Sequence, residues 1–71
     1  MSDGTEASPP LSSREKECLF HLAQGMTTAR LAEALGISEK TAEKHITSAR
    51  KKIGAKTREH AVAIAIRHNL F

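Results

Sequence analysis

The side chains with the clearest chemistry in this sequence are a row of hydrogen-bond donors near its middle. At about 100° per residue, donors spaced i, i+3, i+4 and i+7 share one face of a helix. The residues with this spacing are Lys44, Thr47, Ser48 and Lys51. Ammonium and hydroxyl groups reach base edges and phosphate oxygens in the major groove of DNA. The spacing therefore predicts a helix that presents a polar face to double-stranded DNA.

The remaining residues of this predicted helix fit the same arrangement. The opposite face is a narrow apolar stripe suited to a core: Ala42, Ile46, Ala49 and Ile53. One flank carries Glu43 and Arg50, and the other carries Thr41, His45 and Lys52. His45 has two interpretations, because it either donates to a phosphate or packs against the preceding helix.

Positive charge is concentrated in this segment. The chain has 71 residues, with 11 Lys plus Arg, 8 Asp plus Glu and a net charge of +3. Residues 38–56 hold six of the basic and two of the acidic residues, a net +4, whereas the rest of the chain sums to −1. A charge run is often only a solvated face, but here it coincides with a row of donors and favours a polyanionic partner. With two Phe and no Tyr or Trp, the chain lacks the aromatic platforms of single-strand binders.

Other chemistries fit the sequence poorly. Cys18 and His21 are spaced i, i+3, but two ligands without a second pair make a poor zinc site, and Cys18 falls on a predicted core stripe. So small a chain leaves no room for a catalytic constellation, so we expect no enzyme activity, no metal and no cofactor. The sequence predicts a cytoplasmic protein without membrane contact. It has one cysteine, no signal peptide and no apolar run near the roughly 18 residues of a membrane span.

The elements that must position these groups have starts and stops in the sequence. Residues 1–10 end in Pro-Pro and predict a flexible leader or the tail of an interdomain linker, and residues 11–71 form one domain. The predicted N-caps are Ser12 (in a capping box with Glu15), Thr27 or Thr28, Ser38 and Thr57, and the predicted ends are Gly25, Gly36, Gly54 and Asn69. Four helices and no strand pattern predict an all-α fold. Two short helices joined by a tight glycine turn indicate a helix-turn-helix domain, with the third helix as recognition helix.

Several spaced motifs together identify a family. They are L-S-x-R-E-x-E-x-L, A-x-G-x-T, L-A-x-x-L-x-I-S, T-x-x-x-H, K-K-I-G-A and R-x-x-A-V-x-x-A. Through them residues 11–71 closely resemble the LuxR/GerE-type helix-turn-helix domain of bacterial transcription regulators. The resemblance implies sequence-specific DNA binding in the bacterial nucleoid. The ending TREHAVAIAIRHNLF looks most like the quorum-sensing branch, in which an N-terminal domain binds an acyl-homoserine lactone. The 71 residues do not include such a domain. We therefore expect an isolated DNA-binding domain or a stand-alone member.

Two departures from the family pattern lie on the predicted DNA face. Arg30 stands where the family usually has Glu, and we expect it to add a phosphate contact. Glu43 stands where the family often has Lys. The Glu43 carboxylate either accepts from cytosine N4 or pairs with Lys40 or Arg50.

Pattern and resemblance together assign a role to each polar residue of this face. The residues assigned to base reading are Lys44, Thr47, Lys51 and Glu43. The residues assigned to phosphates are Thr27, Thr28, Arg30, Thr41, His45, Ser48, Arg50 and Lys52.

The last predicted helix has more apolar surface than its own core needs. Residues 61–66 are continuously apolar, whereas a surface helix needs an apolar arc of only about 100°. The helix is either wedged between the first and third helices or bound to a partner. The resemblance implies a homodimer through Val62, Ile64 and Ile66 on two-fold-related DNA. The rival function is a protein-interaction module that docks on RNA polymerase or another regulator without reading DNA.

Overall fold

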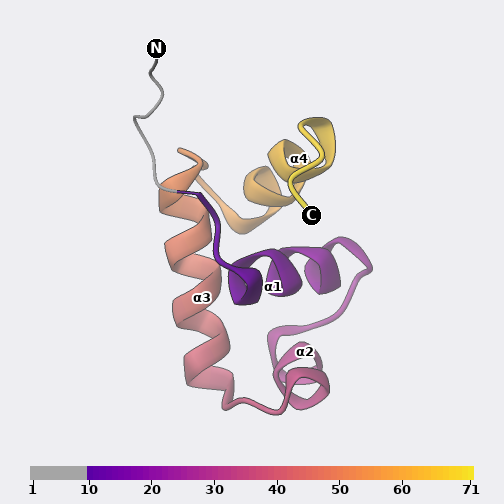
Figure 1. The fold of residues 1–71 in the computed structure, drawn as a ribbon. Helices are drawn as coiled ribbons and strands as arrows, with labels where there is room; N and C mark the ends of the chain where they lie inside the picture. The colour runs from indigo at the N-terminus through magenta and orange to yellow at the C-terminus, as the bar shows by residue number, and fades with distance from the viewer. Residues whose placement is uncertain (1–9) are drawn as a thin grey trace.

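The computed structural model describes residues 10–71, which form four helices (Figure 1). Their bounds are α1 Ser13–Ala23, α2 Thr28–Leu35, α3 Glu39–Lys52 and α4 Arg58–Arg67. All regular structure in this part of the chain is helical, which confirms the predicted all-α class. Apart from Pro10, the expected leader lies outside the described residues. None of the four helices combines the length and the apolar composition needed to cross a membrane.

Each helix begins where a hydroxyl group accepts a hydrogen bond from an amide that has no partner within the helix. Ser12 Oγ accepts from Glu15 N at 3.1 Å, and Glu15 Oε1 accepts from Ser12 N at 2.8 Å, so the predicted capping box is present. The N-caps of the other helices are Thr27, Ser38 and Thr57, and each accepts from the amide three residues later. The starts of all four helices therefore follow from local sequence.

A left-handed glycine makes the turn between α2 and α3 short. Gly36 has a φ of 70°, a conformation in which a Cβ would be strained. Ile37 N donates to Ala32 O at 3.0 Å and closes α2, and Ser38 then caps α3. The turn places α2 across the lower end of α3 in Figure 1.

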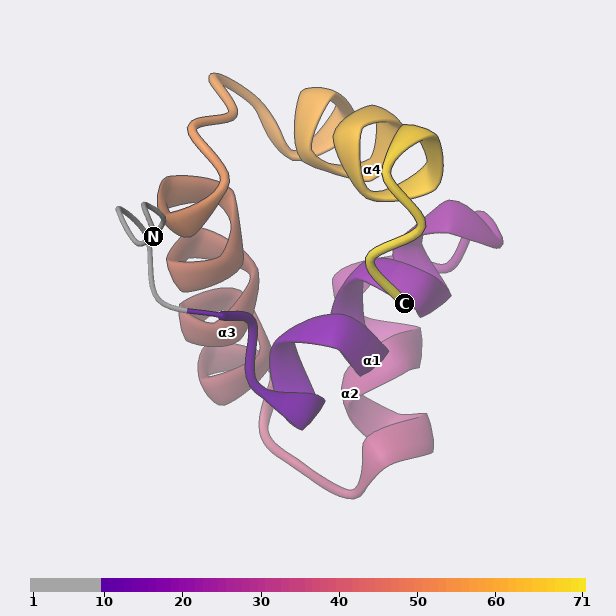
Figure 2. The same cartoon turned by 45° about the horizontal axis from the view of Figure 1, so that its top comes forward.

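The core lies along one side of α3, which packs against α1, α2 and α4. Figure 2 shows these three helices on the same side of α3. Ala42 and Ile46 join a cluster with residues of α1 and α2, and Ala49 joins a second cluster with residues of α1 and α4. Ile53, the fourth residue of the predicted stripe, is only partly buried. The opposite side of α3 is left to solvent.

The core itself is small. Its large, fully buried side chains are Leu19, Leu31 and Cys18, and most of the other buried apolar residues are alanines. Apolar burial contributes about 25 cal/mol per Å², so a core of this size leaves a modest margin of stability. Polar contacts between the helices therefore matter more here than in a larger domain.

Candidate nucleic-acid interface

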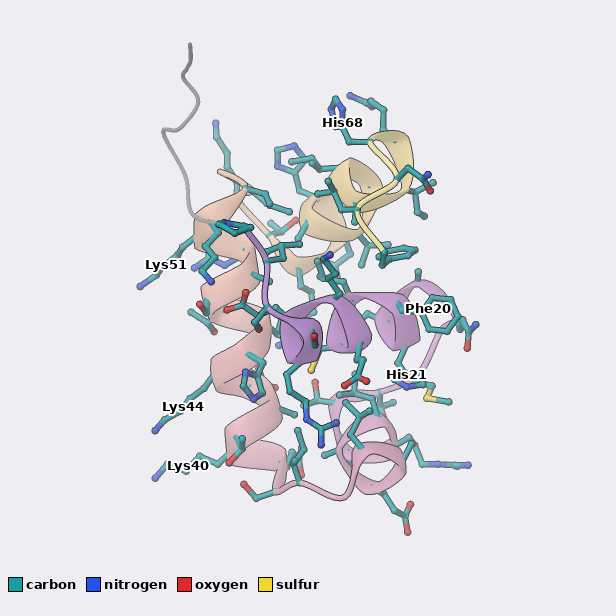
Figure 3. The ribbon with its side chains drawn as sticks, in the orientation of Figure 1. Phe20, His21, Lys40, Lys44, Lys51 and His68 are labelled. Atoms are coloured by element: carbon teal, nitrogen blue, oxygen red, sulfur yellow. The ribbon has the colours of Figure 1, made fainter. Side chains whose placement is uncertain are left out.

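A row of lysines lies on the outward side of α3. Lys44, Thr47 and Lys51 are exposed, and Lys40 lies on the same face one turn before Lys44. Figure 3 shows Lys40, Lys44 and Lys51 pointing away from the other helices. We call these four residues the lysine ridge. Lys40 was not among the residues assigned to DNA from the sequence, although its i, i+4 spacing from Lys44 indicates the same face.

On the flank of α3 that faces α1, a buried carboxylate holds two residues that were assigned to phosphates. The Glu15 side chain is 6% exposed. Ser48 Oγ donates to Glu15 Oε2 at 2.7 Å, and Lys52 Nζ donates to Glu15 Oε1 at 3.0 Å. Lys52 Nζ also donates to Pro10 O at 3.3 Å. We call Glu15, Ser48 and Lys52 the Glu15 network, because it fixes α3 to the start of α1.

The charge of Glu15 is stabilised despite its burial. Burial alone favours the neutral form and raises the pKa of the carboxyl group. Hydrogen bonds from the Ser12 amide, Ser48 and Lys52, together with the charge of Lys52, outweigh burial and lower the pKa of Glu15 to about 2. Glu15 is therefore a carboxylate at neutral pH, and the contact with Lys52 is an ion pair.

The other flank of α3 carries an ion pair of opposite polarity. Arg58, the first residue of α4, donates through Nη2 to Glu43 Oε1 at 3.0 Å and to Glu43 Oε2 at 3.3 Å. The expectation that Glu43 pairs with Lys40 or Arg50 named the wrong partner. Helical spacing favours those two neighbours, but the turn after α3 brings Arg58 back beside Glu43. Arg50 instead donates through Nη1 to Ala55 O at 3.1 Å.

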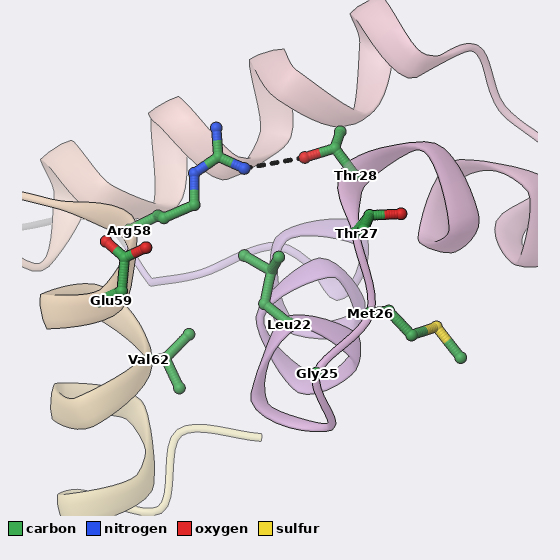
Figure 4. A pocket seen from close by; sticks show the side chains of 8 residues that line it. All are labelled: Leu22, Gly25, Met26, Thr27, Thr28, Arg58, Glu59 and Val62. Carbon is green, nitrogen blue, oxygen red and sulfur yellow. Dashed lines mark hydrogen bonds between the residues drawn. The ribbon is translucent and has the colours of Figure 1, made fainter.

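Arg58 also reaches the start of α2. Its Nη1 donates to Thr28 Oγ1 at 2.8 Å, and Thr28 is only 7% exposed (Figure 4). One guanidinium group thus joins α4 to α2 and α3. Arg58 could not be assigned to the site from the sequence, because no local pattern links it to Thr28 or Glu43.

The remaining residues assigned to phosphates lie at or near the surface. Thr27, the N-cap of α2, and Arg30, in its first turn, are exposed, and Thr27 Oγ1 accepts from Arg30 N at 3.2 Å. Thr41 is half-buried and accepts a hydrogen bond from the Ser38 hydroxyl at 2.8 Å. His45 is also half-buried, so both of its interpretations remain predictions.

Three further features bear on alternative chemistry. A pocket of about 320 Å³ lies beside the contact between Arg58 and Thr28, with Leu22 and Val62 among its lining residues (Figure 4). Among residues 10–71, no three His, Cys, Asp or Glu side chains come close enough to hold a metal ion. Burial raises the pKa of the Cys18 thiol, and the charge of Glu17 adds to the effect, which keeps the thiol protonated.

The residues expected at a dimer interface differ in exposure. Val62 and Ile64 are half-buried and pack against the cluster that α4 forms with α1 and α3. Ile66 is 59% exposed. The helix is therefore partly wedged into the core, with one large apolar side chain left on its surface.

Comparison with known proteins places these features in a family. Residues 9–65 match the model of the luxR family of bacterial regulatory proteins. The chain is 43% identical over 60 residues to the transcriptional activator protein BjaR1 of Bradyrhizobium diazoefficiens, a match that covers 84% of this chain and 25% of BjaR1. It is 42% identical over 62 residues to the spore germination protein GerE of Bacillus subtilis, covering 87% of this chain and 84% of GerE. It is 39% identical over 61 residues to the transcriptional activator protein CarR of Pectobacterium carotovorum, covering 86% of this chain and 25% of CarR. The chain thus spans about a quarter of two of these relatives and most of the third.

Proposed function

We propose the function below for this chain, which belongs to the luxR family of bacterial regulatory proteins. Its four helices form the helix-turn-helix domain of a transcription regulator of that family. The domain binds double-stranded DNA in a sequence-specific manner, with α3 as recognition helix in the major groove. The observation that supports this most strongly is the lysine ridge, an exposed row of cations and a hydroxyl. On the opposite face of the helix, Ala42, Ile46 and Ala49 are buried in the core.

Individual roles follow from the position of each side chain. Lys44, Thr47 and Lys51 on the ridge read bases together with Glu43, which lies in the N-terminal half of α3, where recognition helices approach base edges. The residues assigned to phosphates that lie at or near the surface are Thr27, Arg30, Thr41 and His45. Each of the other four bonds through its side chain to a residue outside its own helix, so a phosphate must share or displace that contact: Thr28, Ser48, Arg50 and Lys52.

Titration of a random-sequence duplex at several salt concentrations tests DNA binding. Each phosphate contact releases counterions, so log affinity should fall linearly with log salt at about −0.9 per phosphate neutralised. Lys44→Ala and Lys51→Ala should each make this slope shallower or relax the preference for particular base pairs. Arg67→Ala, a charge removed from the exposed end of α4, is the matched control. A wild-type affinity that does not change with salt would refute DNA binding and favour a module that docks on a protein such as RNA polymerase.

We further propose that two copies bind a two-fold-symmetric site through α4. Ile66 supports this, because it is a large apolar side chain that the domain does not bury. Ile66→Lys should abolish cooperative binding to a palindrome and leave the affinity for a half-site unchanged, as measured by gel shift. Val62 and Ile64 are poorer probes, since a charge at either would also disturb the core. Retained cooperativity in Ile66→Lys would exclude this side chain from the interface.

A further inference from the structure

The contacts of Arg58 are unusual for a residue outside the recognition helix. Its guanidinium group is bound at two points on two other helices, Glu43 of α3 and Thr28 of α2. Thr28 is almost fully buried at the start of α2, so this end of the contact is anchored in the scaffold. The planar fork of an arginine holds its donors at fixed angles to one another, whereas the ammonium group of lysine rotates on a flexible stem.

The energetics of the pair indicate a role other than stability. The side chains of Arg58 and Glu43 are 40% and 43% exposed, and ion pairs at that exposure contribute little to folding. The geometry nevertheless restricts Glu43, because both of its oxygens face the same guanidinium nitrogen. The consequence of the pair is therefore the position of a carboxylate beside the lysine ridge.

A carboxylate at this place discriminates between bases by its chemistry. It can accept a hydrogen bond from the amino group of cytosine or adenine, whereas guanine and thymine present acceptor oxygens in the major groove. A mobile carboxylate would turn away from the phosphates and lose this selectivity. A carboxylate held by a neighbouring cation stays in place and meets less repulsion from the phosphates.

We propose that Arg58 is a positioning residue for sequence recognition, which holds the Glu43 carboxylate where it selects an amino-bearing base and rejects acceptors. This inference rests on the proposed function, since it requires that α3 read DNA. Arg58 acts through Glu43, and Thr28 fixes the direction from which it acts.

The test is selection of bound sequences from a random duplex pool by wild type, Glu43→Gln, Arg58→Met, Arg58→Lys and the Glu43→Gln/Arg58→Met double variant. The wild type should prefer cytosine or adenine over guanine by about fivefold or more at one position of each half-site. Glu43→Gln identifies that position by relaxing it. Arg58→Met should relax the same position, and the double variant should relax it no further. Arg58→Lys keeps the charge and should bind random duplex as wild type does, yet fail to restore the preference.

Arg67→Met controls for the loss of one positive charge on the same helix, and it should leave every base preference unchanged. Circular dichroism and thermal unfolding check that each variant is folded. If Arg58→Met does not fold, Arg58→Lys still tests the inference. If the wild type enriches a sequence and both Arg58 variants keep its base preference, this inference alone is overturned. It is also overturned if the double variant loses twice as much base preference as either single variant. A wild type that enriches no sequence overturns the proposed function and this inference with it.

Discussion

The two flanks of α3 are fixed by ion pairs of opposite polarity and different depth. Toward α1, the scaffold supplies the carboxylate, Glu15, and α3 supplies the cation, Lys52. Toward α4, the scaffold supplies the cation, Arg58, and α3 supplies the carboxylate, Glu43. The Glu15 side chain is 6% exposed, whereas that of Glu43 is 43% exposed.

The difference in depth separates two tasks. A buried charge with several hydrogen bonds is costly to disturb, so the Glu15 network holds the helix in the fold. A half-exposed pair contributes little to folding and stays within reach of solvent and ligand, so the Arg58 pair is suited to recognition. If this division is correct, variants of one flank change mainly the free energy of unfolding, and variants of the other change mainly DNA specificity.

The largest effect is expected from Glu15→Gln. The variant removes the charge that binds Lys52 and disrupts the contacts to Ser48 and Ser12, at a cost of about 3 kcal/mol in the free energy of unfolding. The midpoint of thermal unfolding should fall by roughly 4–8 °C for each kcal/mol. Glu17→Gln is the control on the same helix, because Glu17 is exposed and its one ion pair among residues 10–71 is with Arg14, three residues away. Equal losses in both variants would contradict a special role for the Glu15 network.

A comparable effect is expected when acid neutralises the same carboxylate. The pKa of Glu15 is about 2 in the folded state against 4.5 ordinarily, so its contribution is complete above about pH 4.5 and is lost as the pH falls toward 2. The difference amounts to on the order of 3 kcal/mol. Urea unfolding of wild type and Glu15→Gln between pH 7 and pH 2 should give two curves that converge in acid. Parallel curves would show that the pKa of Glu15 is not lowered by folding.

An intermediate effect is expected from two adjacent lysines. Lys52→Met should lower the free energy of unfolding by about 1–2 kcal/mol, because the buried Glu15 loses its cation. Lys51→Met should change it by less than about 0.5 kcal/mol, since Lys51 is exposed on the ridge. Affinity for random duplex at low salt should show the reverse order, with the larger loss for Lys51→Met. The same order in both measurements would remove the distinction between ridge and flank.

The smallest effect on stability is expected at the Arg58 pair. In a double-mutant cycle of Arg58→Met and Glu43→Gln, the coupling free energy of unfolding should stay below about 1 kcal/mol. Urea unfolding at neutral pH measures it. A coupling as large as that between Glu15 and Lys52 would make both flanks structural and would contradict the division drawn here.

What the sequence predicts well in this molecule is local. The caps at Ser12, Ser38 and Thr57 depend on contacts three residues apart, and the structure confirms all three. For α2 the sequence left Thr27 and Thr28 open, and the N-cap is Thr27. The buried stripe of α3 is likewise fixed by helical spacing, apart from the partly exposed Ile53 at its end.

What the sequence did not predict depends on how the helices are placed. Ser48 and Lys52 meet Glu15 across 33 and 37 residues, and no pattern at that separation signals the contact. The partner of Glu43 was missed for the same reason, because Arg58 reaches it only after the chain turns between α3 and α4. Roles in DNA binding remain predictions at every one of these positions.

The alanines on the packed side of α3 also constrain how this domain can diverge. Ala42 and Ala49 are fully buried where neighbouring helices meet, so a larger side chain at either would force the helices apart. No such restriction applies to Lys40, Lys44, Thr47 or Lys51, whose side chains are exposed to solvent. Substitutions can therefore accumulate on one side of α3 while the other stays fixed. A lineage of such domains can vary the outward surface of α3 without losing the packing that holds the helix in the fold.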